Sequence, residues 1–453
     1  MGLGTWDRSH SVHHDPQKII AIMTAAAETT KAHDDEHEID QHGQHAHDPI
    51  GGSTTPFYQA PVQLQRWGDQ QMLPHVNWGD LFFDLFYVGA AYNLGNLLRN
   101  ERTWRGILYF SALFLNVSSI WFDKLVYDAR FNVGNDLFHR VVEVAQLAVL
   151  ATAVVHINSV AEMSDTKENP DMFVFCLCNL LHEVYHVVRE LECYFMVKTP
   201  EVKPSTKREV FRHFFSTLLL LAATVISATD FYGDQDDDHY DDHDHMLRMM
   251  AEEKYDDTGD DAYENDAPVY LVLASWVSMG LMLFLKLGSG VTNETSIPMN
   301  VDFVIHRHGE WVMLMLGETV LSLLIVEENH GKVEYYWSFY AGLLTVIILQ
   351  YLHFKSQPHD PSEHAMRRSK LQGILNMILV QIYSGALVAL GASYKMLLYE
   401  FQDEVKSPTG HRLMVGVGDE RMLAGGTVCG DDEECKNFTA HLYCFAMALV
   451  LLT

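Results

Sequence analysis

The sequence predicts an all-α protein, a polytopic transmembrane helix bundle of about ten spans. Two observations lead to this fold class. Apolar runs of roughly the length that a helix needs to cross a bilayer recur along the chain, and most of the net negative charge lies in two segments outside those runs. The mean hydropathy of −0.03 hides this division because it averages both kinds of segment. The expected spans are residues 79–98, 106–126, 138–160, 172–196, 211–231, 268–287, 311–326, 336–354, 373–398 and 438–453.

The acidic segments are residues 1–76, with ten acids and four bases, and residues 234–266, with fifteen acids and two bases. Together they carry most of the net charge of −29. Because such segments bury little apolar surface, we expect a disordered, acidic, histidine-rich tail and an acidic loop. The acidic balance excludes nucleic acid as an expected partner. The expected partners are the lipid bilayer and an ion, proton or small solute, with a homo-oligomer as a further expectation.

Lysine and arginine in the short connections predict the orientation. Eleven of these residues lie in one set of connections and five in the other, which places the amino terminus in the cytosol. We therefore expect a cytosolic tail in 1–76, a transmembrane domain in 77–400 with its insert outside, and an external loop and last span in 401–453. That last apolar run is short, so we expect either a truncated chain or an incomplete final helix. Cys429 and Cys435 lie in the external loop and are the expected disulfide.

Ionisable side chains inside spans cost at least about 2.5 kcal/mol each on insertion scales, so each needs a partner or a function. Under the predicted orientation, such residues from four spans lie in the cytosolic half, which favours a common polar pocket open to the cytosol. Glu318 lies deeper, roughly 15 Å beyond His308. The alternative is a set of interhelical salt bridges and interface groups. The pocket candidates are Asp80, Asp84, Arg130, Arg140, Glu143, Arg307, His308 and Glu318.

His182, Glu183 and His186 fit the pattern H-E-x-x-H. In this pattern two histidines on one helical face bind zinc and the glutamate activates water. The chain has 25 histidines and no recognisable companion motif for a third ligand. We therefore expect no cofactor and no enzymatic activity, and zinc stays an alternative.

Three stretches resemble a known family. WGDLFFDLFYVGAA resembles the opening signature of the bacterial low temperature requirement A (LtrA) membrane proteins, with Asp80 where glutamate is usual and Asp84 matching. YDARFNVGNDLFHR and HRHGEWVMLMLGETVLSL resemble its later stretches, in order, over about residues 75–400. The resemblance implies a polytopic membrane protein, linked by name to growth in the cold, without a settled biochemical activity. The matching residues in the later stretches are Arg130, Arg140, Arg307, His308 and Glu318.

The leading hypothesis is a transporter or channel-like protein for protons, ions or small solutes. In this hypothesis Asp84 pairs with Arg307, while Glu318 and His308 carry protons or ligand, a role that suits histidine because it titrates near neutral pH. A second hypothesis is a non-transporting membrane sensor or scaffold whose acidic loops bind partners. The third is a zinc-binding intramembrane hydrolase or zinc transporter that uses His182, Glu183 and His186.

Overall fold

The computed structural model describes residues 55–65, 78–132, 136–167, 169–199, 202–233, 265–288, 297–326, 333–357, 364–403 and 433–452. Ten helices of 19 or more residues dominate these described parts of the chain. One long helix lies at each predicted span, so the all-α bundle is confirmed. The predicted tail up to residue 54, nearly all of the acidic insert and the Cys429–Cys435 pair fall outside the described side chains. The long helices are α2 (Trp78–Asn100), α3 (Trp104–Asp128), α4 (Leu137–Val155), α6 (Asp171–Met196), α7 (Val202–Gly233), α9 (Ala267–Gly288), α10 (Val301–Leu324), α11 (Val333–Ser356), α13 (Lys370–Asp403) and α14 (Glu433–Leu452).

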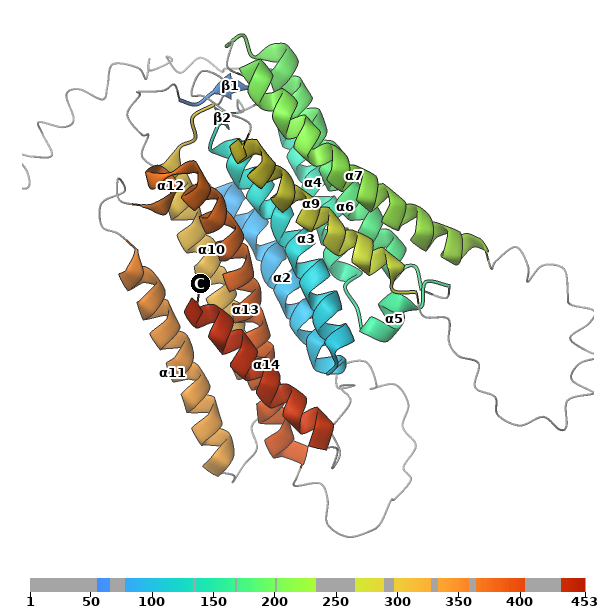
Figure 1. The fold of residues 1–453 in the computed structure, drawn as a ribbon, viewed down its shortest axis with the longest axis vertical. Coiled ribbons are helices and arrows are strands. Elements are labelled where there is room, and N and C mark those ends of the chain that lie inside the picture. The colour runs from blue at the N-terminus through green and yellow to red at the C-terminus, as the bar shows by residue number, and fades with distance from the viewer. Residues whose placement is uncertain are drawn as a thin grey trace, which may run out of the picture. The chain divides into compact units, whose positions relative to one another are not determined.

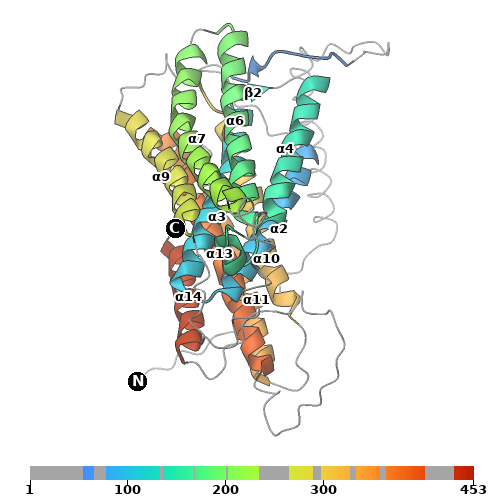
Figure 2. The same ribbon diagram turned by 90° about the vertical axis from the view of Figure 1, so that its right-hand side faces the viewer.

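Helices α2 and α3 lie in the middle of the bundle (Figure 1). On one side of them α9, α7, α6 and α4 lie in a row, each in contact with the next (Figure 2). On the other side α13 contacts α10, α11 and α14. Among the largest fully buried side chains are Tyr87, Trp121 and Trp311, which belong to α2, α3 and α10. The core therefore lies where these three helices meet.

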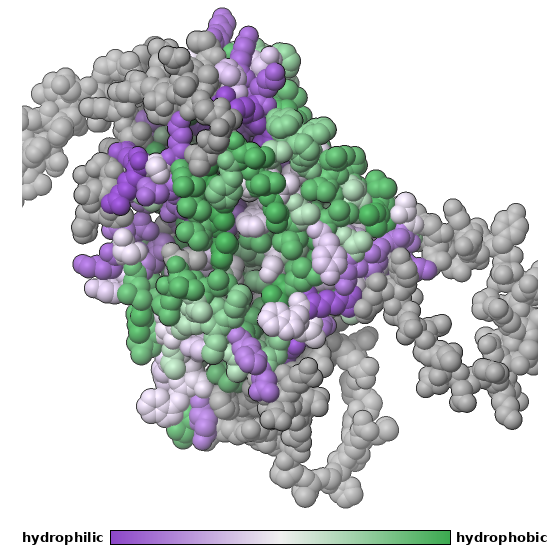
Figure 3. Space-filling view, in the orientation of Figure 1, coloured by the Kyte–Doolittle hydropathy of each residue, from purple (hydrophilic) through white to green (hydrophobic). Residues whose placement is uncertain are grey.

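The peripheral helices expose apolar side chains. Phe211 and Leu218 on α7 and Trp337 and Leu344 on α11 are all more than half exposed. Hydrophobic residues cover the middle of the face in Figure 3, and hydrophilic residues gather toward its ends. An apolar surface of this extent belongs against lipid rather than water. Seven helices (α3, α4, α6, α7, α9, α11 and α13) are long and apolar enough to cross a membrane, so this is an integral multi-pass membrane protein.

Two spans differ in their bounds from the sequence prediction. The predicted 138–160 span ends early, because His156 follows α4 and its Nδ1 lies 2.7 Å from the Asp171 carboxylate at the start of α6. A separate short helix, α5 (Val160–Ser164), follows. Helix α10 starts at Val301, ten residues before the apolar run 311–326 that predicted it, because the Asn300 side chain accepts the Phe303 N–H at 3.1 Å and caps the helix there.

A short arm, residues 56–65, crosses one end of the bundle. Its strand β1 (Val62–Gln63) pairs antiparallel with β2 (Phe131–Asn132), which follows α3. A second short helix, α12 (Ala365–Arg368), lies between α11 and α13.

The arm is also held by side chains. Tyr58 donates its hydroxyl to Glu192 at 2.7 Å, and the Gln59 N–H donates to Asp136 at 2.9 Å. His139 lies between the same two carboxylates, 2.7 Å from Asp136 and 3.1 Å from Glu192. Burial disfavours the charged form of Asp136, but the Gln59 N–H and His139 outweigh it and hold the pKa of this carboxyl below its usual value.

Candidate functional site

The centre of the site is an ion pair between α2 and α10. The Arg307 guanidinium donates two hydrogen bonds to Asp84, at 2.9 and 3.0 Å, and also binds Glu310. The Trp121 indole N–H donates to the same Asp84 carboxylate at 2.8 Å. Asp84 is 1% exposed. The structure therefore makes the Asp84–Arg307 pairing that the sequence predicted, although the two residues are more than 220 positions apart.

Charged side chains continue from this pair toward α6. Lys124 on α3 binds Asp80 at 2.9 Å and also binds Asp128. Asp128 in turn accepts a hydrogen bond from Arg189 on α6 at 3.2 Å. Four helices therefore contribute to two neighbouring groups of ion pairs, one around Arg307 and one around Lys124, which we together call the charged layer. Its members are Asp80, Asp84, Lys124, Asp128, Arg189, Arg307 and Glu310.

A second group, the α7 cluster, joins α3, α6 and α7 close to this layer. Arg212 donates to Asp123 at 2.9 Å and pairs with Glu209 at 2.9 Å. His213 bonds through Nδ1 to Glu183 at 2.6 Å, and Ser216 donates its hydroxyl to the other Glu183 oxygen at 2.8 Å. All five charged or imidazole side chains are largely buried.

Sequence reasoning missed most of the α7 cluster because it started the fifth span at residue 211, which left Glu209 in a loop, and because it counted Arg212 among the loop bases that set the orientation. The helix begins at Val202, so Glu209, Arg212 and His213 lie on its buried turns. The spacing of Glu209 and His213, four residues apart on one helical face, was the available signal. Arg130, a predicted pocket residue, joins this cluster by binding Glu209 at 3.1 Å.

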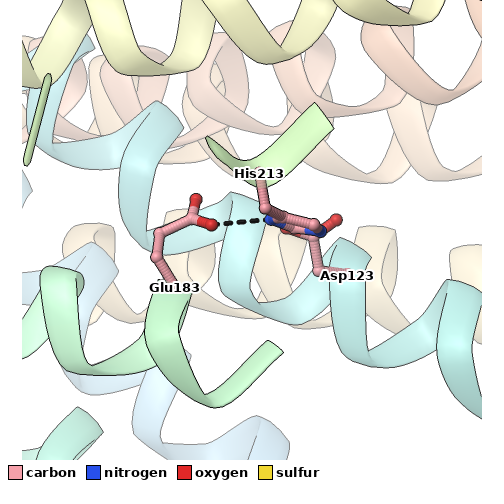
Figure 4. A group of neighbouring side chains, drawn as sticks. All are labelled: Asp123, Glu183 and His213. Carbon is pink, nitrogen blue, oxygen red and sulfur yellow. Dashed lines mark hydrogen bonds and ion pairs between the residues drawn. The ribbon is translucent and has the colours of Figure 1, made fainter. Parts of the chain in front are cut away.

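Asp123, Glu183 and His213 have ligand atoms that all lie within 4.8 Å of one another, and these residue types bind divalent metals. Figure 4 shows the His213 ring with Glu183 on one side and Asp123 on the other. Arg212 lies 2.9 Å from both Asp123 and Nε2 of His213, so a cation already neutralises the carboxylate where a metal would bind. A metal ion would have to displace the Arg212 guanidinium.

The three H-E-x-x-H residues have different surroundings in the structure. Glu183 is bound to His213 and Ser216, as described above. Nε2 of His182 and Nε2 of His186 are buried and have no hydrogen-bond partner among the described residues. The His186 ring stacks on His213 with centroids 5.8 Å apart. This arrangement differs from a zinc-protease site, where both histidines bind the metal and the glutamate is left for water.

Arg140 and Glu143 lie outside the charged layer. They bind each other at 3.2 Å on α4, and their side chains are 54% and 42% exposed. Their depth along the membrane predicted them to be in the pocket, but the face of α4 that carries them points outward.

His308 packs against the Phe122 ring, with 5.5 Å between the ring centroids. Its Nε2 is buried and has no hydrogen-bond partner among the described residues.

An aromatic layer, defined by Tyr87, Trp121 and Trp311, packs beside the Asp84–Arg307 pair. The Trp311 ring lies 4.5 Å from Trp121 and 5.2 Å from Tyr87 between centroids. Its indole N–H donates to Ser384 on α13 at 2.8 Å. All three aromatic residues are about 1% exposed, so the layer is closed to solvent.

Glu318 lies beyond the aromatic layer on α10 and is 2% exposed. The Ser322 hydroxyl donates to its Oε1 at 3.3 Å, and Oε2 has no hydrogen-bond partner among the described residues. Lys395 on α13, 3% exposed, interacts with it electrostatically. Sequence reasoning missed Lys395 because a single lysine hardly changes the mean hydropathy of a long apolar run.

Residues 75–235 match the family model described as bacterial low temperature requirement A protein (LtrA). The match covers α2 to α7, with Asp84 and the α7 cluster, and ends before α10, so the resemblance of the Arg307–Glu318 stretch stays a prediction. No curated protein and no solved structure matches the chain. The matched residues include the opening motif WGDLFFDLFYVGAA, which contains Asp80 and Asp84 of the charged layer. Over residues 75–235, this chain is therefore similar to the LtrA family of membrane proteins.

Proposed function

We propose that the protein is a transporter or channel-like protein for protons, ions or small solutes, with no enzymatic activity. The observation that carries this proposal is a pair of buried charged sites on one face of α10, with the aromatic layer between them. Arg307 belongs to the first site, Trp311 to the aromatic layer and Glu318 to the second site.

Helix geometry places these three residues in line. Trp311 and Glu318 follow Arg307 by four and eleven positions, which are about one and three helical turns, so all three lie on the same face. The rise from Arg307 to Glu318 is roughly 16 Å, about half of the hydrocarbon thickness. Charged groups therefore lie at two depths of one path through the bundle.

The two sites differ in how well their charges are satisfied. Asp84 and Arg307 neutralise each other with three hydrogen bonds from Arg307 and Trp121, which suits a fixed structural pair. Glu318 has one long hydrogen bond and one buried oxygen without a partner among the described residues. A poorly satisfied carboxylate inside a membrane protein is expensive, and such groups mark ion and proton pathways. Glu318 is therefore the residue to which we assign transport.

The predicted orientation would open the charged layer to the cytosol. Many of the basic residues that predicted it lie at the end of the bundle where α7 and α13 begin and α3 ends, among them Lys203, Arg130 and Lys370. The amino end of α2, with Asp80 and Asp84, lies at that same end because α2 precedes α3 in an alternating bundle. In this arrangement a solute from the cytosol would reach the charged layer first and Glu318 after it.

The test is flux through purified protein in liposomes. A pH or potassium gradient is imposed, and a trapped pH-sensitive dye reports proton movement. Wild-type protein should carry flux above that of protein-free vesicles, and Glu318→Gln should reduce it to that background. The matched control is Glu334→Gln, which changes an exposed glutamate on α11 and should leave flux unchanged. Absence of wild-type flux under both gradients, or an unchanged Glu318→Gln variant, would refute the proposal.

A further inference from the structure

Two buried charged atoms on helices that contact each other, α2 and α10, have no hydrogen-bond partner among the described residues. One is Oε2 of Glu318 on α10, and the other is Nε of Arg99 on α2. Buried polar atoms are nearly always hydrogen-bonded, and each exception needs an explanation such as a bound molecule. The two atoms belong to charges of opposite sign, so the molecule that satisfies both must offer an acceptor to one and a donor to the other.

Three helices bring these groups together. Helices α2, α10 and α13 are in mutual contact. A Cβ added to Gly391 of α13 would lie 3.0 Å from the Thr319 Cα of α10, so the backbones approach closely beside Glu318. On α13, Lys395 donates to Asn96 of α2 at 2.9 Å and interacts electrostatically with both Glu318 and Arg99. We call this set (Asn96, Arg99, Glu318 and Lys395) the Glu318 junction.

Charge favours an anionic ligand with a donor group. Among the described side chains of the junction, Arg99 and Lys395 carry two positive charges and Glu318 carries one negative charge. A metal cation would face two like charges. A simple anion would balance the excess positive charge but would leave the Glu318 oxygen without a donor and would repel it. A carboxylate that also carries a hydroxyl or an amine meets both requirements.

The cations can still make the bonds that this ligand needs. A lysine ammonium has three N–H donors, and Lys395 uses one for Asn96 while its ammonium lies 4.8 Å from the centre of the Tyr92 ring. Arg99 lies over the Tyr399 ring at 5.1 Å, a contact that leaves the guanidinium edge available for a carboxylate. The close approach of the three helices restricts the ligand to a small molecule.

We propose that the Glu318 junction binds small organic carboxylates that carry a hydroxyl or amine donor near the carboxyl group. The ligand carboxylate binds Arg99 and Lys395, and its hydroxyl or amine donates to Oε2 of Glu318. This inference deepens the proposed function by naming the solute class at Glu318, and it rests on that function only for the claim that the bound solute crosses the membrane.

The experiment uses three acids with the same three-carbon skeleton: propionate, lactate and alanine. They differ only at the second carbon, which carries hydrogen, hydroxyl or ammonium. Binding of each to the purified full-length protein in detergent is measured by isothermal titration calorimetry. Lactate or alanine should bind about tenfold tighter than propionate or more, because propionate leaves the Glu318 oxygen unpaired. Preference for lactate indicates a hydroxy acid, and preference for alanine indicates an amino acid.

Variants separate the two halves of the junction. Glu318→Leu should abolish the preference over propionate, since it removes the acceptor, and Arg99→Met should weaken all three acids together. Glu334→Leu, on the exposed face of α11, is the matched control and should change nothing. Circular dichroism and size-exclusion chromatography identify any variant that does not fold. If Glu318→Leu does not fold, Glu318→Gln replaces it, because glutamine keeps the shape of the side chain. Glu318→Gln should reduce the preference for alanine.

The proposal is overturned if no acid binds, if all three bind equally to wild-type protein, or if the preference survives in both Glu318 variants. The outcome is independent of the flux test. Binding with the expected preference but without any flux would overturn the proposed function alone. Flux that depends on Glu318 without selective acid binding would overturn this inference alone.

Discussion

Replacing Arg307 by methionine tests whether the charged layer holds the bundle together. In this variant the Trp121 indole is the one hydrogen-bond donor that Asp84 keeps among the described residues, in a place where the side chain is 1% exposed. Two bonds of 2.9 and 3.0 Å are lost, and the carboxylate is left buried without its counter-charge. Breaking a buried ion pair by removing one partner costs about 3–5 kcal/mol. We therefore expect a loss of unfolding free energy of that size.

The control is Arg140→Met, which removes an ion pair of similar length whose side chains are 54% and 42% exposed. Exposed pairs contribute about 0–1 kcal/mol, so this variant should be almost neutral. A double variant, Arg307→Met with Asp84→Asn, removes both charges and should recover much of the lost stability.

The assay is unfolding of the purified protein in mixed detergent micelles, followed by far-ultraviolet circular dichroism at increasing mole fractions of sodium dodecyl sulfate. If Arg307→Met costs no more than Arg140→Met, the Asp84–Arg307 pair does not stabilise the bundle. If the double variant is as unstable as Arg307→Met alone, then the cost does not come from an unpaired buried carboxylate.

Three further predictions follow from the packing, the α7 cluster and the arm. Gly342→Ala should reduce stability in the same assay by about 1–3 kcal/mol, because the new Cβ would lie 2.9 Å from Cδ2 of Leu323, and an unchanged midpoint would contradict the packing of α11 on α10. Zinc content after equilibration with zinc and removal of the excess should be the same in His182→Ala as in wild type, whereas loss of one zinc per chain would restore the H-E-x-x-H interpretation. The lowered pKa of Asp136 means that its contribution to arm binding is complete above the ordinary carboxyl range, about pH 4, and disappears only as the pH falls through that lowered value. Limited proteolysis of residues 56–65 should therefore show protection from pH 7 down to pH 5 and release in more acidic buffer, and release near pH 6 would contradict this.

The sequence was sufficient for the number and order of the long helices, because each span needs a long apolar run and such runs are visible without any knowledge of packing. The Asp84–Arg307 pairing followed from charge and depth alone, since a buried carboxylate requires a cation at its own level.

Depth along the membrane, however, leaves the rotation of each helix undetermined. Arg140 and Glu143 have the predicted depth but lie on the outward face of α4, where they bind each other. Conversely, Arg212 and Lys395 lie on inward faces and were missed, since their partners come from helices that are distant in the sequence. Which face of a helix is buried depends on its neighbours, and that information is not contained in a single apolar run.

The aromatic layer separates the two charged sites, so its integrity is the most direct test of a path between them. Trp311→Ala removes one of the two tryptophans of this layer, and Trp337→Ala removes a tryptophan that is 73% exposed on α11. The measurement is the rate of proton leak through each variant in liposomes under a fixed pH gradient. The path described here predicts a faster leak for Trp311→Ala than for wild type, with Trp337→Ala unchanged. Equal leak rates for both variants and for wild type, in folded protein, would contradict it.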